Sequence, residues 1–340
     1  MSEYREIKGT AIKSATANTG LVESEIWYDS NAGAFKIEGA TSTSAWASGG
    51  NLNNNSQGRA GFGTQTAAVA GPGVGPGGGS PPGIQVTEEY DGSTWTNGNN
   101  STRSDDENRY NAGAGSPTAG AIASGGYPGT MTAATEEYDG TSWTAGGNVN
   151  TARRGYVFDG AVVTSSLIFG GNTQPYPGTT TVTGATEHYD GTSWTAGGTM
   201  GTARMNGAGS SGGSQTSSLS TGGSQPALTS NTEEYNGTSW TEVNNQPTAV
   251  GYQGYAGTQT DCLVWNGYTP TAVTTTYNYD GTSWSSNPAS LSLARLNYHN
   301  NSGTASSAIV FGGEGPAGTV TTTEEFTGVG VRETKTLTTS

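Results

Sequence analysis

Apolar and polar positions alternate in this chain in a fixed order that returns again and again. A Tyr is followed by a polar Asp-Gly or Asn-Gly pair, two hydroxylated residues and a Trp, first at residues 90–95. The phrase recurs about every 47 residues, the spacing of a repeat architecture built from small sheets. Asp-Gly and Asn-Gly between apolar residues predict a hairpin turn, because Gly accepts positive φ. The six tryptophans of the series are Trp46, Trp95, Trp143, Trp194, Trp240 and Trp284.

One period contains four strand-like segments. The first is an Arg followed by small residues, as at 59–63, and a short polar turn separates it from the second, which ends in a glycine pair such as Gly170-Gly171. The third reads Thr-Glu-Glu-Tyr, as at 87–90, and the fourth carries the Trp. Four antiparallel strands in succession are typical of one propeller blade.

A glycine pair, then a Tyr, then a Trp five residues later resembles the kelch repeat, whose family forms β-propellers. The resemblance covers residues 40–328, although 70–73 and 265–267 replace the glycine pair with other residues. The repeats end with a third strand, 323–326, that no Trp follows, and they begin with a fourth strand at Trp46 that no third strand precedes. These halves complete each other and would leave no open sheet edge.

We therefore expect an all-β protein, a six-bladed kelch-like β-propeller closed by its N- and C-terminal strands. Its predicted parts are an N-terminal segment with a hairpin (1–39), the propeller (40–328) and a C-terminal tail (329–340).

Composition narrows the function classes. The net charge of the 340 residues is −14, which argues against nucleic acid and anionic lipid as partners. Cys262 is the only cysteine, so an intrachain disulfide and a cysteine-based zinc cluster are excluded. The chain has neither an apolar run of about 18 residues for membrane insertion nor an apolar signal core. We expect a soluble chain made in a cytoplasm.

The paired glutamates of the third strands are candidates for acid–base chemistry. Strand alternation, however, places the two carboxylates on opposite faces. Arginines recur in the same phase, so we expect structural Arg–Glu pairs rather than a catalytic site. These arginines are Arg59, Arg109, Arg153 or Arg154, Arg204 and Arg295. His188 and His299 lack the companions of a metal site, and we predict no catalytic residue, no metal and no cofactor.

Variable loops connect strands two to three and four to one, and both sets emerge on the same face of a propeller. Binding residues concentrate in such loops, where exposed aromatics stack on sugar rings or anchor protein partners. The alternative is plain loop packing. The candidate residues on this face are Tyr127, Tyr176, Tyr268, Arg103, Asp105 and Asp106.

Residues 1–39 lie outside the repeat and contain a predicted hairpin, 26–29 with 34–37. The segment 25–30 resembles a hairpin near the N-termini of bacteriophage structural proteins, and the whole layout resembles virion proteins of marine phages. The resemblance implies a non-enzymatic component of a tail, fibre or surface appendage, localised to the virion, that mediates contacts with other virion proteins or binds a glycan or protein of the host surface. The alternatives are a carbohydrate-active propeller enzyme, a lectin-like glycan-binding module and an intracellular kelch adaptor.

An exposed apolar hairpin on a soluble ring would be a liability unless it were covered. We expect Ile26, Trp27, Tyr28 and Phe35 to pack against another virion subunit or a symmetry mate. The competing possibility is that they plug one mouth of the propeller of the same chain.

Overall fold

The computed structural model contains two compact units. It describes residues 13–15, 26–29, 33–40, 43–76, 83–103, 112–123, 131–175, 180–224, 226–299, 301–329 and 332–336. The larger unit is Ala45–Phe326, and the smaller one is formed by the segments on either side of it.

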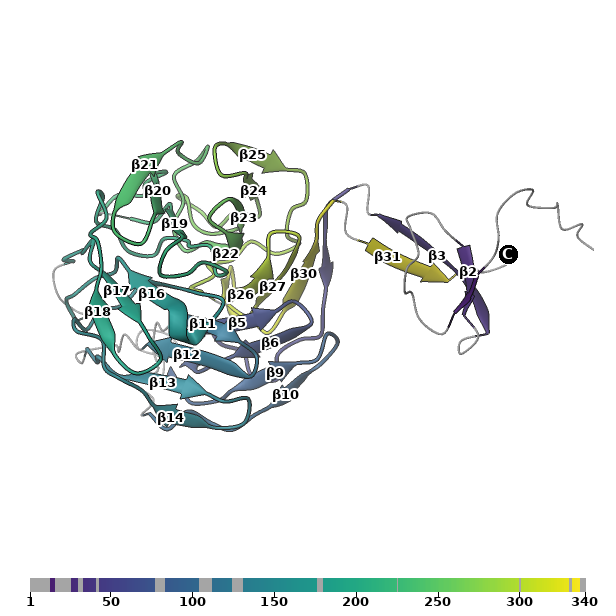
Figure 1. Ribbon diagram of the computed structural model, residues 1–340, viewed down its shortest axis with the longest axis horizontal. Coiled ribbons are helices and arrows are strands. Elements are labelled where there is room, and N and C mark those ends of the chain that lie inside the picture. Colours follow the sequence, from purple (N-terminus) through teal and green to yellow (C-terminus); the bar gives the residue numbers. More distant parts are fainter. Residues whose placement is uncertain are drawn as a thin grey trace, which may run out of the picture. The chain divides into compact units, whose positions relative to one another are not determined.

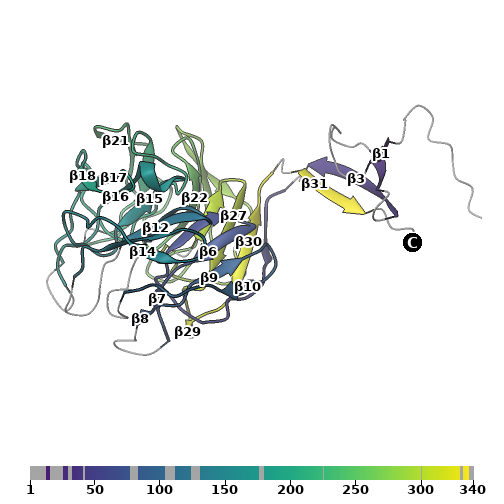
Figure 2. The ribbon, with the colours of Figure 1, turned by 60° about the horizontal axis from the view of Figure 1, so that its bottom comes forward.

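The larger unit is a ring of six sheets (Figures 1 and 2), and in five of them the strands follow one another in chain order. Blade 1 contains β5 (Gly61–Thr64), β6 (Ala67–Ala70), β9 (Glu88–Tyr90) and β10 (Trp95–Asn97). Blade 2 contains β11 (Ala112–Ser116), β12 (Ala119–Ala123), β13 (Thr135–Tyr138) and β14 (Trp143–Ala145). Blade 3 contains β15 (Val157–Asp159), β16 (Ser166–Phe169), β17 (Thr186–Tyr189) and β18 (Trp194–Ala196), with a 3-10 turn, η1 (Val163–Ser165), between its first two strands.

The other three blades differ in small ways from this scheme. Blade 4 contains β19 (Ser218–Thr221), β20 (Thr232–Tyr235) and β21 (Trp240–Val243), and a single bridge from Ala208 to Thr221 takes the place of its inner strand. Blade 5 contains β22 (Gly254–Thr258), β23 (Asp261–Trp265), β24 (Thr276–Tyr279) and β25 (Trp284–Asn287). Blade 6 contains β26 (Asn301–Thr304), β27 (Ser307–Phe311), β30 (Thr323–Thr327) and β4 (Ala45–Ser48).

The ring closes as the sequence predicts. β4 is the outermost strand of blade 6 and pairs with β30. The Trp46 ring lies 5.2 Å from that of Phe326 and 5.1 Å from that of Trp265, and its Nε1 donates to Thr276 Oγ1 at 3.2 Å. The strand therefore joins blade 6 to blade 5 as well as completing its own sheet, and this pairing closes the ring.

Small residues let neighbouring sheets approach closely. A Cβ placed on Gly120 of blade 2 would lie 2.2 Å from Phe62 Cε2 of blade 1. The glycine pairs have a second role, since Gly170 and Gly171 have φ values of 70° and 101°. In blade 5 Asn266 (φ 46°) takes the first position, because Asn tolerates the left-handed region better than most residues.

Two short hairpins extend the loops between second and third strands. β7 (Gly73–Val74) pairs with β8 (Gly83–Ile84) in blade 1, and β28 (Glu314–Gly315) pairs with β29 (Gly318–Thr319) in blade 6. Figure 2 shows both on the same face of the ring, the face that carries the variable loops.

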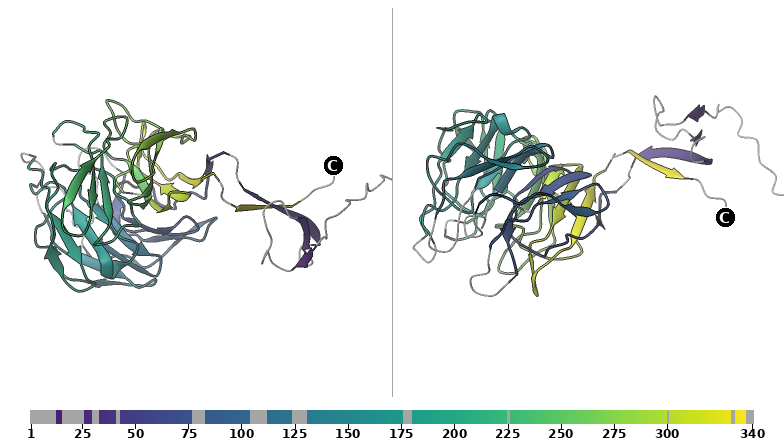
Figure 3. Two further views of the ribbon diagram at one scale, coloured as in Figure 1. Left: turned by 45° about the horizontal axis from the view of Figure 1, so that its top comes forward. Right: turned by 90° about the horizontal axis from the view of Figure 1, so that it is seen from below.

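The smaller unit is a four-stranded sheet in the order β1-β2-β3-β31, drawn in purple and yellow in Figure 3. Its strands are β1 (Lys13–Ala15), β2 (Ile26–Asp29), β3 (Ala34–Ala40) and β31 (Arg332–Thr336). β2 and β3 form the predicted hairpin, with Tyr28 opposite Phe35.

The predicted tail at 329–340 requires correction, because its described part is a strand that pairs with β3. The predicted boundaries at 39 and 329 likewise move to Ser44 and Thr327. The physical reason is the closure itself. β4 and β30 are hydrogen-bonded neighbours, so the segments that flank the ring leave blade 6 from adjacent strands and pair with each other in the smaller unit.

Candidate functional site

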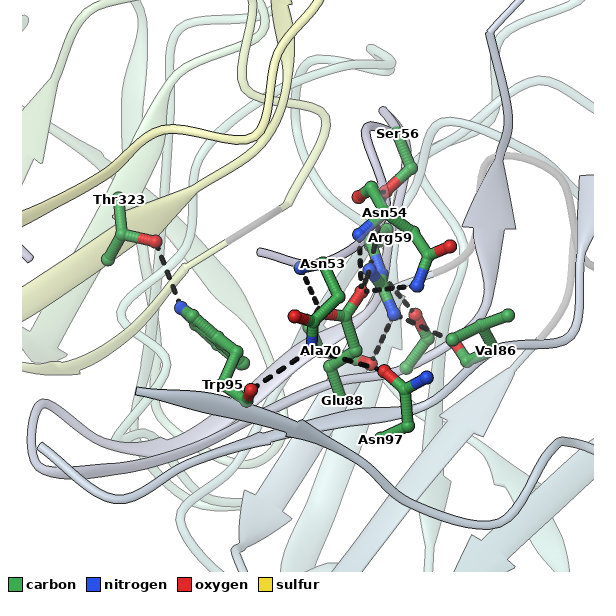
Figure 4. Close-up of polar contacts among 11 residues, drawn as sticks. Asn53, Asn54, Ser56, Arg59, Ala70, Val86, Glu88, Trp95, Asn97 and Thr323 are labelled. Atoms are coloured by element: carbon green, nitrogen blue, oxygen red, sulfur yellow. Dashed lines mark hydrogen bonds and ion pairs between the residues drawn. The ribbon is translucent and has the colours of Figure 1, made fainter. Parts of the chain in front are cut away.

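Buried arginine–glutamate pairs are the first candidates for chemistry, and blade 1 shows their surroundings (Figure 4). Arg59 Nη1 lies 2.7 Å from Glu88 Oε1, and both side chains are fully buried. The guanidinium also donates to the carbonyl oxygens of Gly71, Ala70 and Val86, at 2.7, 2.8 and 2.7 Å. Burial lowers the pKa of Arg59, and Glu88 opposes that shift. The pair holds three strands together and has no access to a substrate.

The same pair recurs in four further blades, as the sequence predicts, with one correction. The pairs are Arg103–Glu136 at 3.4 Å, Arg204–Glu233 at 3.1 Å, Arg153–Glu187 and Arg295–Glu324. In blade 2 the partner is therefore Arg103, whereas Arg109 lies outside the described residues. Arg103 is 6% exposed, so its predicted place on the ligand face is wrong.

Blade 5 has neither member of the pair. The bridge between Gly251 and Tyr268 aligns Val250 with the arginine position, and Tyr277 occupies the position of the first Glu. Thr248 Oγ1 lies 3.2 Å from the Tyr277 hydroxyl. Both charges are replaced together, as expected when each exists to neutralise the other in a buried site.

The second glutamate of each third strand faces the next blade. Tyr279 donates its hydroxyl to Glu234 Oε1 at 2.8 Å, and Tyr90 donates to Glu325 Oε1 at 2.5 Å. Burial, assisted by Glu325, raises the pKa of Tyr90 to about 12. Tyr138 with Glu89 and Tyr189 with Glu137 form the same bond.

The two remaining seams between blades use other residues. His188 Nε2 lies 2.9 Å from the Tyr235 hydroxyl, so His188 serves in place of a glutamate. Between blades 5 and 6, Asn278 replaces the glutamate where Phe326 replaces the tyrosine. The two glutamates of a pair do not converge, which confirms the prediction from strand alternation.

The Asp-Gly turns use their carboxylates internally. Asp91 Oδ1 accepts the backbone N–H groups of Ser93 and Thr94 at 2.8 and 2.7 Å. These backbone and side-chain hydrogen bonds lower the pKa of Asp91 to about 2. Within the described ranges, no three His, Cys, Asp or Glu side chains gather to hold a metal ion.

Asp159 is a buried carboxylate that sequence reasoning missed. It accepts the hydroxyls of Ser210 and Ser218 at 2.6 and 2.5 Å and the N–H of Gly213 at 3.0 Å. Burial raises its pKa against these hydrogen bonds. The side chain holds the irregular inner segment of blade 4 in place, which a strand ladder does in the other blades. The one signal that the sequence offers for this contact is an acidic residue at the end of an apolar strand, Val157–Asp159.

A cavity of about 440 Å³ occupies the channel at the turn side of the ring. Residues from all six blades line it, mostly Gly, Ala, Ser and Thr at the ends of inner strands, and Asp261 is the charged member of the lining. This mouth lies at the opposite end of the inner strands from the variable loops. A lining so poor in functional groups offers a ligand little beyond shape.

The variable-loop side carries three neighbouring tyrosines, Tyr252, Tyr268 and Tyr298, here named the tyrosine cluster. The rings of Tyr252 and Tyr298 lie 4.8 Å apart at an interplanar angle of 63°. The Tyr298 hydroxyl donates to Glu314 Oε2 at 3.2 Å, and Tyr268 is 37% exposed. Burial raises the pKa of Tyr252, and the positive charge of Arg154 opposes the shift.

The structure places the remaining predicted residues as follows. Tyr268 lies on the predicted ligand face, whereas Tyr127, Tyr176, Asp105 and Asp106 fall outside the described residues. Ile26, Trp27 and Tyr28 lie in β2, and Phe35 of β3 is 42% exposed. Their docking role stays a prediction. All six repeat tryptophans lie in the fourth strands, where Trp95, Trp143, Trp194 and Trp240 are buried and Trp46 and Trp284 are half-buried.

Comparison with protein-family models and with curated proteins finds no match. Among solved structures, the one titled "Structure of YjhT" is similar, with a TM-score of 0.64 and 13% sequence identity. The match covers 82% of this chain and 97% of that one. In the described part of the chain, no helix is long and apolar enough to cross a membrane. The structural likeness establishes the fold of this chain as a β-propeller.

Proposed function

We propose that this protein is a non-enzymatic structural component of a virion, in a tail, fibre or surface appendage. The observation that carries the proposal is the path of the two chain ends. Both leave the ring from neighbouring strands of blade 6, β4 and β30, and both contribute strands to a separate sheet. A propeller whose two ends build one small second unit is suited to display, with the ring presented and the sheet attached to a neighbour.

The chemistry of the ring supports display rather than catalysis. The first glutamates of five blades are neutralised by buried arginines, and the four second glutamates each accept a hydroxyl from the next blade. These carboxylates stabilise the ring and are committed to it. The hairpin of residues 26–37 and the Tyr-Asp-Gly-Thr-Ser-Trp phrases support the virion assignment through their resemblance to phage proteins.

The rival function, carbohydrate-active catalysis, needs two carboxylates around one glycosidic bond. Glu314 is the carboxylate that the described contacts place at the tyrosine cluster. Incubation of the full chain with oligosaccharides should therefore release no new reducing ends, while turnover by the purified chain would favour the rival.

Labelling purified particles tests the display role. An antibody against the propeller should decorate particles that carry the full chain, at a fixed place on the particle. A chain lacking residues 1–39 and 331–340 should keep the melting transition of the ring but fail to join particles. Particles without label, or normal incorporation of the truncated chain, would refute the proposal.

A further inference from the structure

The entry segments of the inner strands form a hydrogen-bonded arc around the channel. The Asn206 N–H donates to Gly155 O at 2.7 Å, the Tyr252 N–H to Asn206 O at 2.8 Å, and the Asn297 N–H to Tyr252 O at 2.9 Å. The arc runs from blade 3 to blade 6, one residue from each. Three of its four residues, all except Asn297, share the left-handed backbone conformation.

Tyr252 is the exception among the residues of this arc. Gly155 and Asn206 have φ values of 62° and 56°, and Gly and Asn are the residues that tolerate this left-handed region. Tyr252 has φ 58° at the matching position, where a bulky side chain is strained. Tyr298 beside the arc also has a positive φ, 32°. Blades 3 and 4 avoid this strain with Gly and Asn, so a Tyr kept at the matching position of blade 5 points to a functional use of its side chain.

The side chains of the two residues with positive φ, Tyr252 and Tyr298, contact each other beside the carboxylate of Glu314. Tyr252 packs edge-to-face on Tyr298, whose hydroxyl contacts Glu314. Tyr268 is fixed beside them, because its backbone exchanges two hydrogen bonds with Gly251, at 2.8 and 3.0 Å. The cluster therefore combines aromatic faces, phenol hydroxyls and a carboxylate at one mouth of a rigid ring.

We propose that the tyrosine cluster is a saccharide-binding site. Aromatic rings present flat apolar faces for the C–H side of a sugar ring, and their hydroxyls bond at the rim. The Glu314 carboxylate keeps acceptor capacity beyond its bond from Tyr298, which suits sugar hydroxyls as donors. A protein partner would be better matched by an apolar anchor pocket than by three tyrosines, one of which is bonded to a carboxylate. The site goes beyond the display role and does not depend on the virion assignment.

The test measures sugar binding and folding on the same variants of the full chain. An array of defined neutral and acidic oligosaccharides identifies the tightest probe, and calorimetric titration with that probe gives its affinity. Tyr252→Gly should weaken binding roughly tenfold or more, as for a central aromatic anchor. Its melting temperature should change little, because release of the backbone strain offsets the lost ring contact.

Two further variants keep the outcome interpretable. Ser211→Gly relieves the same kind of strain (φ 54°) at the opposite mouth and should leave the affinity unchanged. Tyr268→Ser alters an exposed ring, so it should fold normally and still weaken binding. The proposal is overturned if no sugar on the array binds the full chain. It is equally overturned if the affinity survives both tyrosine substitutions, or if Tyr252→Gly lowers only the melting temperature.

Discussion

Replacing Arg204 by Val should destabilise the propeller strongly. The side chains of Arg204 and Glu233 are 1% and 2% exposed, with Nη1 and Oε1 3.1 Å apart. Without the guanidinium, the carboxylate stays buried with the N–H groups of Gly201 and Thr202 at 2.7 and 3.2 Å. Breaking a buried pair in this way costs about 3–5 kcal/mol. At an unfolding entropy of about 2.1 cal/mol/K per residue over roughly 280 residues, the melting temperature falls by about 5–8 °C.

Blade 5 supplies the compensating change. Val250 and Tyr277 occupy the positions of Arg204 and Glu233 one blade on, so Arg204→Val with Glu233→Tyr copies a combination that this fold already uses. Thr202 matches the threonine that lies beside the Tyr277 hydroxyl. The double variant should regain about 2 kcal/mol of the loss, within the range of coupling energies for contacting residues.

Thermal and urea unfolding followed by tryptophan fluorescence measure these differences. Arg154→Val, at the neighbouring half-exposed arginine of blade 3, is the control and should change stability by less than about 1 kcal/mol. The reasoning is refuted if Arg204→Val has the same melting temperature as the unaltered chain. It is also refuted if the double variant loses as much free energy of unfolding as the two single variants added together.

Three more predictions follow from buried polar contacts and from the closing strand. Burial lowers the pKa of His299 from 6.5 to about 4, so the folded state stays neutral while the unfolded chain binds a proton. Stability is therefore lost as pH falls from about 6.5 to about 4, by roughly 1.4 kcal/mol per pH unit, and His299→Asn should flatten this slope of melting temperature against pH. Trp46→Ala should cost about 2–4 kcal/mol in urea unfolding because it loosens the closing strand, and an unchanged midpoint would contradict the closure argument. Tyr279→Phe should cost about 1 kcal/mol, and adding Glu234→Asn, which copies the seam between blades 5 and 6, should restore most of it; no recovery would show that the seam is not a paired contact.

Repeated local chemistry determined the fold from sequence. The Tyr-Asp-Gly-x-x-Trp phrase encodes a hairpin by itself, since its turn and both flanking strands lie within a few residues. Counting phrases and matching the incomplete ends predicted six blades and the pairing of Trp46 with Phe326. The pairing of arginines with glutamates could be read because both recur in phase. The prediction failed at Arg109, because the loop from blade 1 to blade 2 is irregular in length and the arginine that pairs with Glu136 is Arg103.

Tertiary structure alone decided the features without a repeating signal. Asp159 is satisfied by donors about 50 residues away, and no spacing rule indicates that they meet. β31 pairs with β3 because ring closure places both chain ends on adjacent strands, although almost 300 residues separate them. The tyrosine cluster depends on the backbone angle at Tyr252, whose N–H and carbonyl oxygen are hydrogen-bonded to Asn206 and Asn297 of the neighbouring blades. Sequence periodicity therefore specified the ring, because each blade is a local unit, whereas contacts between blades placed the residues that carry the candidate chemistry.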